Sequence, residues 1–326
     1  MIIAKAPLRI TLGGGGTDLH SYYFKHGGFW ISAAVDKYIY ISIHDIFPDE
    51  IILKYSKLER VKTVEEVEHA LLRECLRAMG VRERIEISSF ADLPEGTGLG
   101  SSGAFTVALL KGLHSHTHRH VTNRELAEEA CRVEIDKLAR PVGKQDQYIA
   151  AFGGINCFAI APGSDQVEVL PLQIPQPALY ALEEGCAFFF TGYSRQASAI
   201  LAEQHDRSKK DDAAMIENLH AVKDLGLRSK AALERGDLRA FAVLLNEQWK
   251  LKLGRSASMV NSNIARWFQV GRDSGALGGK LIGAGGGGFL MFLAEDKARL
   301  RQAMAREGLQ EIRMRFEFEG AQTLVA

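Results

Sequence analysis

A glycine-rich stretch in the first third of the chain could bind a phosphate group. Residues 93–103 read LPEGTGLGSSG and lie between a strand-like segment and an apolar, helix-like segment. The glycines remove side chains from the loop, so backbone N–H groups can approach an anion, and the dipole of the following helix favours negative charge there. No lysine follows the glycines, so this is not a Walker loop. We expect phosphate contacts from Gly96, Gly98, Leu99, Gly100, Ser101, Ser102 and Gly103.

A tight turn capped by a serine is the alternative interpretation of this loop, because serine hydroxyls are good helix N-caps. An isolated Gly-x-Gly pair would favour that turn. The complete pattern between a strand and an apolar helix favours phosphate binding. Ser101 and Ser102 could also offer their hydroxyls to a phosphate or to Mg²⁺.

Two carboxylates follow the loop at positions where they could do chemistry. Glu134 lies in a predicted helix over residues 125–138, on the face that carries Ala127, Ala130, Cys131 and Leu138. Burying an unpaired charge is costly, so Glu134 should bind a ligand or form a salt bridge in the core. Asp146 lies in the segment PVGKQDQ. A helix N-cap or a surface position is the alternative to a catalytic role for this aspartate.

Three segments, in this order, resemble the motifs of the GHMP kinases, the family of galactokinase and of homoserine, mevalonate and phosphomevalonate kinases. They are residues 6–19 (APLRITLGGGGTDL), residues 93–103 and residues 281–290 (LIGAGGGGFL). The resemblance implies the α+β, two-domain GHMP kinase fold, with a ribosomal S5 domain 2-like N-terminal domain and a ferredoxin-like C-terminal domain. It places the active site in the cleft between the domains and implies ATP and Mg²⁺ as cofactors.

The same resemblance implies roles for single residues. Glu134 and Ser102 would bind Mg²⁺. Asp146 would accept the proton of the attacking sugar hydroxyl, and Arg9 would steady Asp146 and the γ-phosphate, for which a planar guanidinium is suited. The implied substrate-binding residues are Gly14, Gly15, Thr17, Asp18, Arg195, Gly285 and Gly286.

Some segments narrow the resemblance to the heptose-phosphate kinases of the family. They are LGGGGTD, residues 191–197 (TGYSRQA) and residues 278–289. This likeness implies phosphorylation of the anomeric hydroxyl of D-glycero-D-manno-heptose 7-phosphate to the 1,7-bisphosphate, on the way to nucleotide-activated heptose for capsule or cell-surface glycan. Cations outside the nucleotide motifs could hold the acceptor's own phosphate. The candidates are Arg195, Lys252 and Arg255, with Lys144 beside the carboxylate.

Two other functions stay open at this point. One is a kinase of the same family for fucose, galactose or a hexosamine. The other is a non-catalytic sensor that binds sugar and ATP on the same scaffold. The combination of Ser102, Glu134, Asp146 and Arg9 favours a catalyst, since a binding protein needs no base.

Periodicity predicts the elements that must position these residues. Strands are expected at 2–12, 38–43, 84–90, 155–160, 289–293 and 312–318. Helices are expected at 64–79, 104–113, 125–138, 196–204, 212–234, 237–252 and 263–271. Thr63 with Glu66 and Thr122 with Glu125 form capping boxes that predict two helix starts. The histidine-rich residues 114–120 are expected in an exposed loop rather than a metal site.

Composition and length set the remaining expectations. The 326 residues carry 40 Lys and Arg against 40 Asp and Glu, so a formal net charge of zero calls for neither nucleic acid nor membrane as a partner. The expected partner is a small-molecule sugar phosphate, and a homodimer is left open. Four scattered cysteines predict reduced core thiols, and the absence of a signal sequence predicts a cytoplasmic protein. A soft boundary divides residues 1–165, the ATP-binding domain, from residues 166–326.

Overall fold

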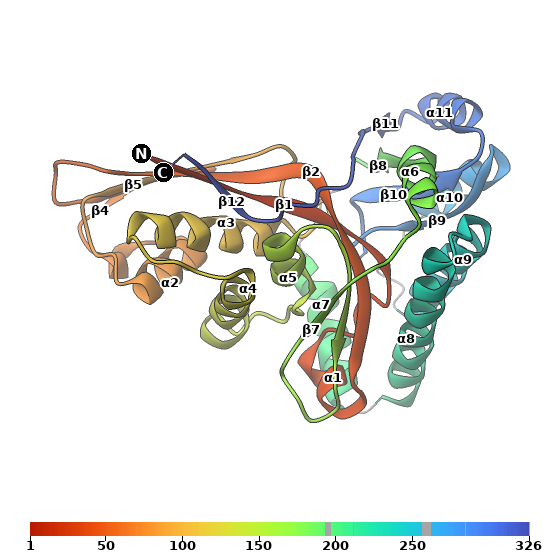
Figure 1. Cartoon of the computed structure of the whole chain (residues 1–326), viewed down its shortest axis with the longest axis horizontal. Coiled ribbons are helices and arrows are strands. Elements are labelled where there is room, and N and C mark those ends of the chain that lie inside the picture. Colours follow the sequence, from red (N-terminus) through yellow and green to blue (C-terminus); the bar gives the residue numbers. More distant parts are fainter. Residues whose placement is uncertain (193–196, 211, 256–261, 284, 326) are drawn as a thin grey trace.

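The computed structural model describes residues 1–192, 197–210, 212–255, 262–283 and 285–325. Two sheets and the helices around them make up an α+β protein (Figure 1). The strands are β1 (Ile2–Gly13), β2 (Gly28–Asp45), β3 (Ile51–Lys54), β4 (Leu58–Val61), β5 (Ile85–Ala91), β6 (Ile155–Ile160), β7 (Glu168–Pro171), β8 (Cys186–Phe190), β9 (Ala276–Leu281), β10 (Phe289–Ala294), β11 (Gln310–Glu311) and β12 (Gln322–Val325).

Helices pack against these sheets and connect them. The first half of the chain contributes α1 (His20–His26), α2 (Ala70–Met79), α3 (Ser101–His116), α4 (Asn123–Cys131) and α5 (Gln145–Phe152). The second half contributes α6 (Gln176–Gly185), α7 (Ala197–Lys209), α8 (Ala213–Glu234), α9 (Leu238–Arg255), α10 (Ser262–Asp273) and α11 (Lys297–Arg306). Short helical turns lie at Val64–Glu66 and, as a π-helix, at Arg132–Lys137.

The larger sheet is built around the long hairpin of β1 and β2. Its strand order is β12-β1-β2-β5-β3-β4, and β6 and β7 join it beside β2. The first part of β2 pairs with β6, and the second part pairs with β5, so one 18-residue strand holds both halves of the sheet together. Because β1 is buried along most of its length, its polar residues are held in fixed positions.

The smaller sheet has the order β11-β8-β10-β9 and lies at the opposite end of the molecule in Figure 1. Helices α8 and α9 pack on each other, α8 also packs on β1 and β2, and α9 packs on β9. This helix pair therefore joins the two sheets and faces the end of β1 where the glycine run begins.

The chain finally returns to the first sheet. β12 pairs antiparallel with β1, and the N- and C-termini lie side by side in Figure 1. β7 also follows residue 165 and pairs with β6 in the first sheet. The domain boundary at residue 165 stays a prediction. At least two strands after it, β7 and β12, belong to the sheet that residues before it mainly form.

Most expected elements are present, but three differ from the expectation. The helix expected from Val64 begins at Ala70, with His69 as its N-cap, because the Glu66 carboxylate accepts from the backbone N–H of Lys62 and leaves no capping box at Thr63. The box at Thr122 is present. The expected helix over 125–138 ends at Cys131 and continues as the π-helix.

The expected strand at residues 312–318 is also wrong, since Phe316 forms an isolated bridge with Val35. Part of a ladder with β2 forms there, since the N–H of Glu317 donates to the carbonyl of Ala34. Side chains interrupt it: the Glu183 carboxylate accepts from the N–H of Phe316, and the Asp36 carboxylate accepts from that of Arg315.

The histidine-rich segment is only partly the exposed loop that its sequence predicts. α3 continues through His116, and His114 is buried with its Nε2 2.7 Å from Glu129 Oε2. His118 and His120 are exposed. All four cysteines are buried and free, as expected. Among the described residues, no helix is long and apolar enough to cross a membrane.

Candidate active site

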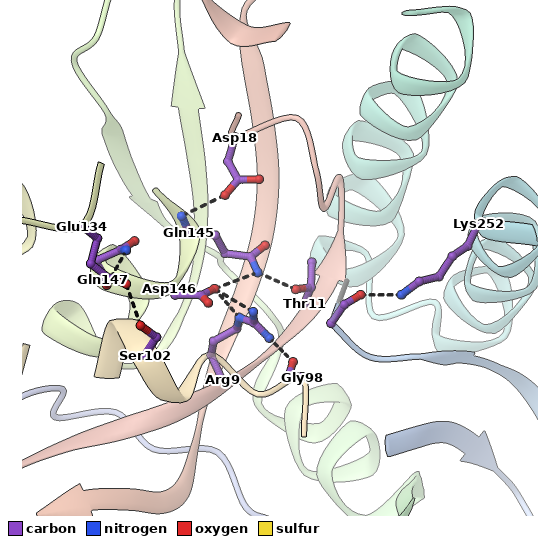
Figure 2. Close-up of polar contacts among 11 residues, drawn as sticks. Arg9, Thr11, Asp18, Gly98, Ser102, Glu134, Gln145, Asp146, Gln147 and Lys252 are labelled. Atoms are coloured by element: carbon purple, nitrogen blue, oxygen red, sulfur yellow. Dashed lines mark hydrogen bonds and ion pairs between the residues drawn. The ribbon is translucent and has the colours of Figure 1, made fainter. Parts of the chain in front are cut away.

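Arg9 joins three segments that are far apart in the sequence. Its Nε donates to Asp146 Oδ1 at 2.7 Å, and its Nη1 donates to the carbonyl oxygen of Gly98 at 2.5 Å (Figure 2). Its backbone N–H donates to the carbonyl of Leu99 at 2.9 Å. Because the side chain is buried and charged, these contacts fix strand β1, the glycine-rich loop and helix α5 relative to one another.

The glycine-rich loop has the backbone that phosphate binding requires. Gly96, Gly98 and Gly100 have φ angles of 80°, 81° and 77°, in the left-handed region that favours glycine. α3 begins at Ser101 with Gly100 as its N-cap, and no side chain in the described chain caps it. The first N–H groups of α3 are therefore available to an anion, and the alternative of a serine-capped turn is wrong.

The third glycine-rich segment packs directly on this loop. A Cβ on Gly283 would lie 2.5 Å from the Cα of Gly98, and a Cβ on Gly288 would lie 2.2 Å from the carbonyl oxygen of Thr97. Only glycine allows this backbone-to-backbone contact. Gly283 lines the cavity described below, whereas Gly285 and Gly286 are outside its described lining. The segment therefore supports the glycine-rich loop through Gly283 and Gly288.

Glu134 and Ser102 form a close pair of oxygen donors. Ser102 Oγ donates to Glu134 Oε2 at 2.6 Å, and Gln147 Nε2 donates to Glu134 Oε1 at 2.9 Å. The carboxylate is 1% exposed. Burial raises its pKa, against the hydrogen bonds from Ser102 and Gln147 that lower it. Two hard oxygen donors from different elements fit a divalent cation such as Mg²⁺.

Arg140 is a site residue that the sequence patterns did not single out. Its Nη1 donates to Ser102 Oγ at 2.8 Å and lies 3.4 Å from Glu134 Oε2. The salt bridge considered for Glu134 therefore exists in the structure beside the oxygen pair. A sequence signal was present, because Arg140 stands in the break between the two carboxylates, next to Pro141.

Asp18 lies on the other side of Asp146 from Ser102 and Glu134 (Figure 2). Its Oδ2 accepts from the backbone N–H of Gln145 at 3.1 Å, and Gln145 Nε2 donates to Thr11 Oγ1 at 2.7 Å. Burial raises the pKa of Asp18, the Gln145 hydrogen bond lowers it, and the charge of Asp146 raises it further. Gln145 and Thr11 were also missed, although Gln145 is adjacent to the predicted aspartate.

Thr17 has a different position from the one its sequence neighbours suggest. It is fully buried, and its Oγ1 contacts the carbonyl oxygens of Gly14 and Phe29 at 2.8 and 2.7 Å. Thr17 therefore braces the turn that carries Asp18. Gly14 needs its φ of 71° in that turn, and Gly15 lines the cavity. Arg195 lies outside the described residues.

These groups surround one cavity of about 630 Å³ between the two sheets. The first sheet and its loops contribute Arg9, Thr11, Asp18, the glycine-rich loop, Arg140 and Asp146. The opposite wall contains α8, α9 and β9, with Gln248, Lys252 and Lys280. Lys280 Nζ donates to Gln248 Oε1 at 2.8 Å, and Lys252 Nζ donates to the carbonyl of Leu281 at 2.9 Å. Cations therefore line both walls.

Two family models match this chain, one in each half of the sequence. Residues 61–154 match the GHMP kinase N-terminal domain, and residues 229–308 match the GHMP kinase C-terminal domain. The chain belongs to the GHMP kinases. It is a phosphotransferase that acts on a sugar hydroxyl, and ATP is the phosphoryl donor used by this family.

Relatives of this kinase agree along its whole length. The D-glycero-α-D-manno-heptose 7-phosphate kinase of Campylobacter jejuni is 29% identical over 94% of each chain. A D-glycero-D-manno-heptose 1-phosphate kinase from Bacteroides thetaiotaomicron has a structure that is 26% identical, with a TM-score of 0.81, covering 100% of this chain and 99% of that one. A galactokinase from Lactococcus lactis, 17% identical over 99% of this chain and 94% of that one with a TM-score of 0.76, shares the fold.

The loop geometry predicts that Gly100→Val abolishes ATP binding. A Cβ at Gly100 would lie 3.1 Å from Asp146 Cγ and 3.2 Å from Arg9 Cγ, so a larger side chain must displace the ion pair or fill the phosphate position. Calorimetric titration with ATP should show a loss of about 100-fold or more, equivalent to roughly 3 kcal/mol.

Gly308→Val is the matched control, because Gly308 has the same φ of 77° and a Cβ added there would have no described atom within 4 Å. It should carry similar backbone strain and bind ATP normally. Wild-type ATP affinity in a folded Gly100→Val protein would contradict the phosphate assignment.

Proposed function

We propose that this kinase phosphorylates the anomeric hydroxyl of D-glycero-D-manno-heptose 7-phosphate, giving the 1,7-bisphosphate for nucleotide-activated heptose in capsule or cell-surface glycan synthesis. The observation that carries the proposal is the similarity to the Campylobacter jejuni heptose 7-phosphate kinase over 94% of both chains. The plant bifunctional fucokinase relative from Arabidopsis thaliana is 24% identical, and the match covers 30% of its length.

The cavity supports a phosphorylated acceptor. A second phosphate needs donors away from the ATP phosphates, and amines or guanidinium groups supply them. Lys252 and Lys280 lie on the α9 and β9 wall, and Lys252 also donates to the carbonyl of Gly283 beside the glycine-rich loop. We assign them, with Arg195, as the candidates for holding the acceptor's phosphate.

Asp146 is the proposed base. Its carboxylate lines the cavity and is 29% exposed, while Arg9 holds Oδ1 in place. The acceptor oxygen forms a bond to the γ-phosphorus as its proton passes to Asp146. The bond from that phosphorus to the β–γ bridging oxygen breaks, and its electron pair leaves with ADP.

Asp18 is the proposed anchor of the sugar. It is 8% exposed, lines the cavity and is braced through the Gln145 N–H, so it can accept hydrogen bonds from sugar hydroxyls in a fixed orientation. Gly15 lines the same cavity.

An acceptor panel tests the proposed substrate. A coupled ADP-release assay should compare the heptose 7-phosphate, the heptose 1-phosphate, the unphosphorylated heptose, fucose and galactose. We expect kcat/KM for the heptose 7-phosphate to exceed that for each other acceptor by about 100-fold or more. A buried site built to bind a polar group discriminates strongly against acceptors that lack this group. Equal turnover of phosphorylated and unphosphorylated heptose would make this a plain sugar kinase.

Replacing the base tests the catalytic assignment. Asp146→Asn should lower kcat by roughly 10²–10⁴-fold, the usual contribution of a general base. ATP affinity should stay near the wild-type value, because a carboxylate supplies no hydrogen-bond donor to the ATP phosphates. A variant that keeps most of its kcat would show that Asp146 only orients Arg9.

Ser102 and Glu134 are the proposed ligands that would hold Mg²⁺, whose charge would offset that of the nucleotide phosphates. Glu134→Gln keeps the size of the side chain and removes the anionic ligand. A Mg²⁺ titration should show that the concentration for half-maximal rate rises by about 10-fold or more. An unchanged titration curve would return Glu134 to the role of a core salt-bridge partner.

A further inference from the structure

Arg140 occupies the place where the metal ligands meet. Its guanidinium donates to Ser102 Oγ at 2.8 Å and lies 3.4 Å from Glu134 Oε2, the two oxygens that lie 2.6 Å apart. The side chain is 36% exposed and lines the cavity, beside the glycine-rich loop. It is therefore a cation at the phosphate end of the active site, on the wall opposite Lys252.

Two unusual backbone features place this arginine. Residues Arg132–Lys137 form a π-helix, and Ala139 has a φ of 49°, in the left-handed region that non-glycine residues seldom adopt. The backbone N–H of Arg140 donates to the carbonyl of Glu134 at 3.0 Å, which ties the two residues together. Backbone in such rare conformations concentrates at functional sites, because surrounding contacts must maintain it.

The contacts of Arg140 are incompatible with a metal on the same oxygens. Mg²⁺ binds oxygen ligands at about 2.0–2.1 Å and carries two positive charges, so it would repel a guanidinium that shares Ser102 Oγ and Glu134 Oε2. Arg140 must then turn to another partner. When ATP binds together with the metal, the nearest new anion would be its triphosphate at the glycine-rich loop, next to Ser102.

We propose that Arg140 is a catalytic arginine with two positions. In the enzyme without nucleotide it neutralises Glu134. When Mg²⁺ and ATP bind, its guanidinium turns onto the γ-phosphoryl group and donates to the oxygens that carry charge during transfer. Arg140 forms and breaks no covalent bond, and its positive charge stabilises the transferring group.

The test uses binding, which needs no acceptor and is therefore independent of the proposed sugar. Calorimetric titrations should compare ATP with ADP, both with Mg²⁺, for the wild type, Arg140→Ala and Arg132→Ala. Arg132 is the matched control, an exposed arginine on the π-helix. We expect Arg140→Ala to weaken ATP about 10-fold or more and ADP by about 2-fold at most, since ADP lacks the γ-phosphoryl group.

Kinetics give the second readout on any accepted sugar. Arg140→Ala should lower kcat by roughly 10²–10³-fold, as for loss of one transition-state donor, with KM for the acceptor within about 2-fold. Equal weakening of ATP and ADP, or a kcat within about 2-fold of wild type, would overturn the proposal and leave Arg140 as a brace for Glu134. Should Arg140→Ala not fold, Arg140→Gln retains a donor for Ser102 and decides between the same outcomes.

Discussion

The ion pair between Arg9 and Asp146 is the interaction on which the active site depends. A single buried guanidinium contacts the carboxylate on α5 and the carbonyl of Gly98, while its backbone N–H holds Leu99. The proposed base and the proposed phosphate loop are therefore positioned by one side chain on a largely buried strand of the sheet. A change in any of these segments must alter the distance between the acceptor and the phosphate.

Glycine extends this constraint to the second sheet. The backbone of the 283–288 segment lies against Thr97 and Gly98 so closely, at Gly283 and Gly288, that any side chain there would collide. The phosphate loop is thus pressed between Arg9 on one side and the turn before β10 on the other. The two walls of the cavity meet at the loop, and Asp18, Lys252 and Lys280 also line the space between them.

The charges in the cavity are arranged around buried carboxylates. Burial raises the pKa values of both Asp18 and Glu134, and each is held by hydrogen bonds that favour the ionised form. Arginines stand beside two of the carboxylates: Arg9 at Asp146 and Arg140 at Glu134. The first-sheet side of the site therefore carries charges of both signs that a nucleotide, a metal ion and a phosphorylated sugar can complement.

Local patterns predicted the parts of the site that depend on local chemistry. The glycine-rich loop before an apolar helix and a carboxylate on an apolar helix face were recognisable because each places a residue type where it would be unusual without a function. The structure brings Arg9, Ser102 and Asp146 to one cavity wall, with Glu134 buried directly behind Ser102. Thr17, predicted at the substrate, braces its own turn instead, and no local pattern distinguishes these two uses of a hydroxyl.

What was missed depends on which of several possible hydrogen-bond partners each group binds. Arg140 follows a π-helix, whose register a 3.6-residue period does not describe. The capping box expected at Thr63 failed because Glu66 bonds to the neighbouring Lys62 N–H. The strand expected from 312 to 318 is interrupted at Arg315 and Phe316, where carboxylates from other elements accept from the backbone N–H groups. Sequence spacing shows which residues can form such hydrogen bonds, but not which partner each of them binds in the folded protein.

A crystal structure of the enzyme with Mg²⁺, a non-hydrolysable ATP analogue and the heptose 7-phosphate would test the central claim most directly. The account predicts the anomeric hydroxyl within about 3 Å of an Asp146 carboxylate oxygen, the range for proton transfer to a general base, with the Arg9 ion pair intact. An acceptor hydroxyl placed away from Asp146, with Arg9 still paired to that carboxylate, would contradict it.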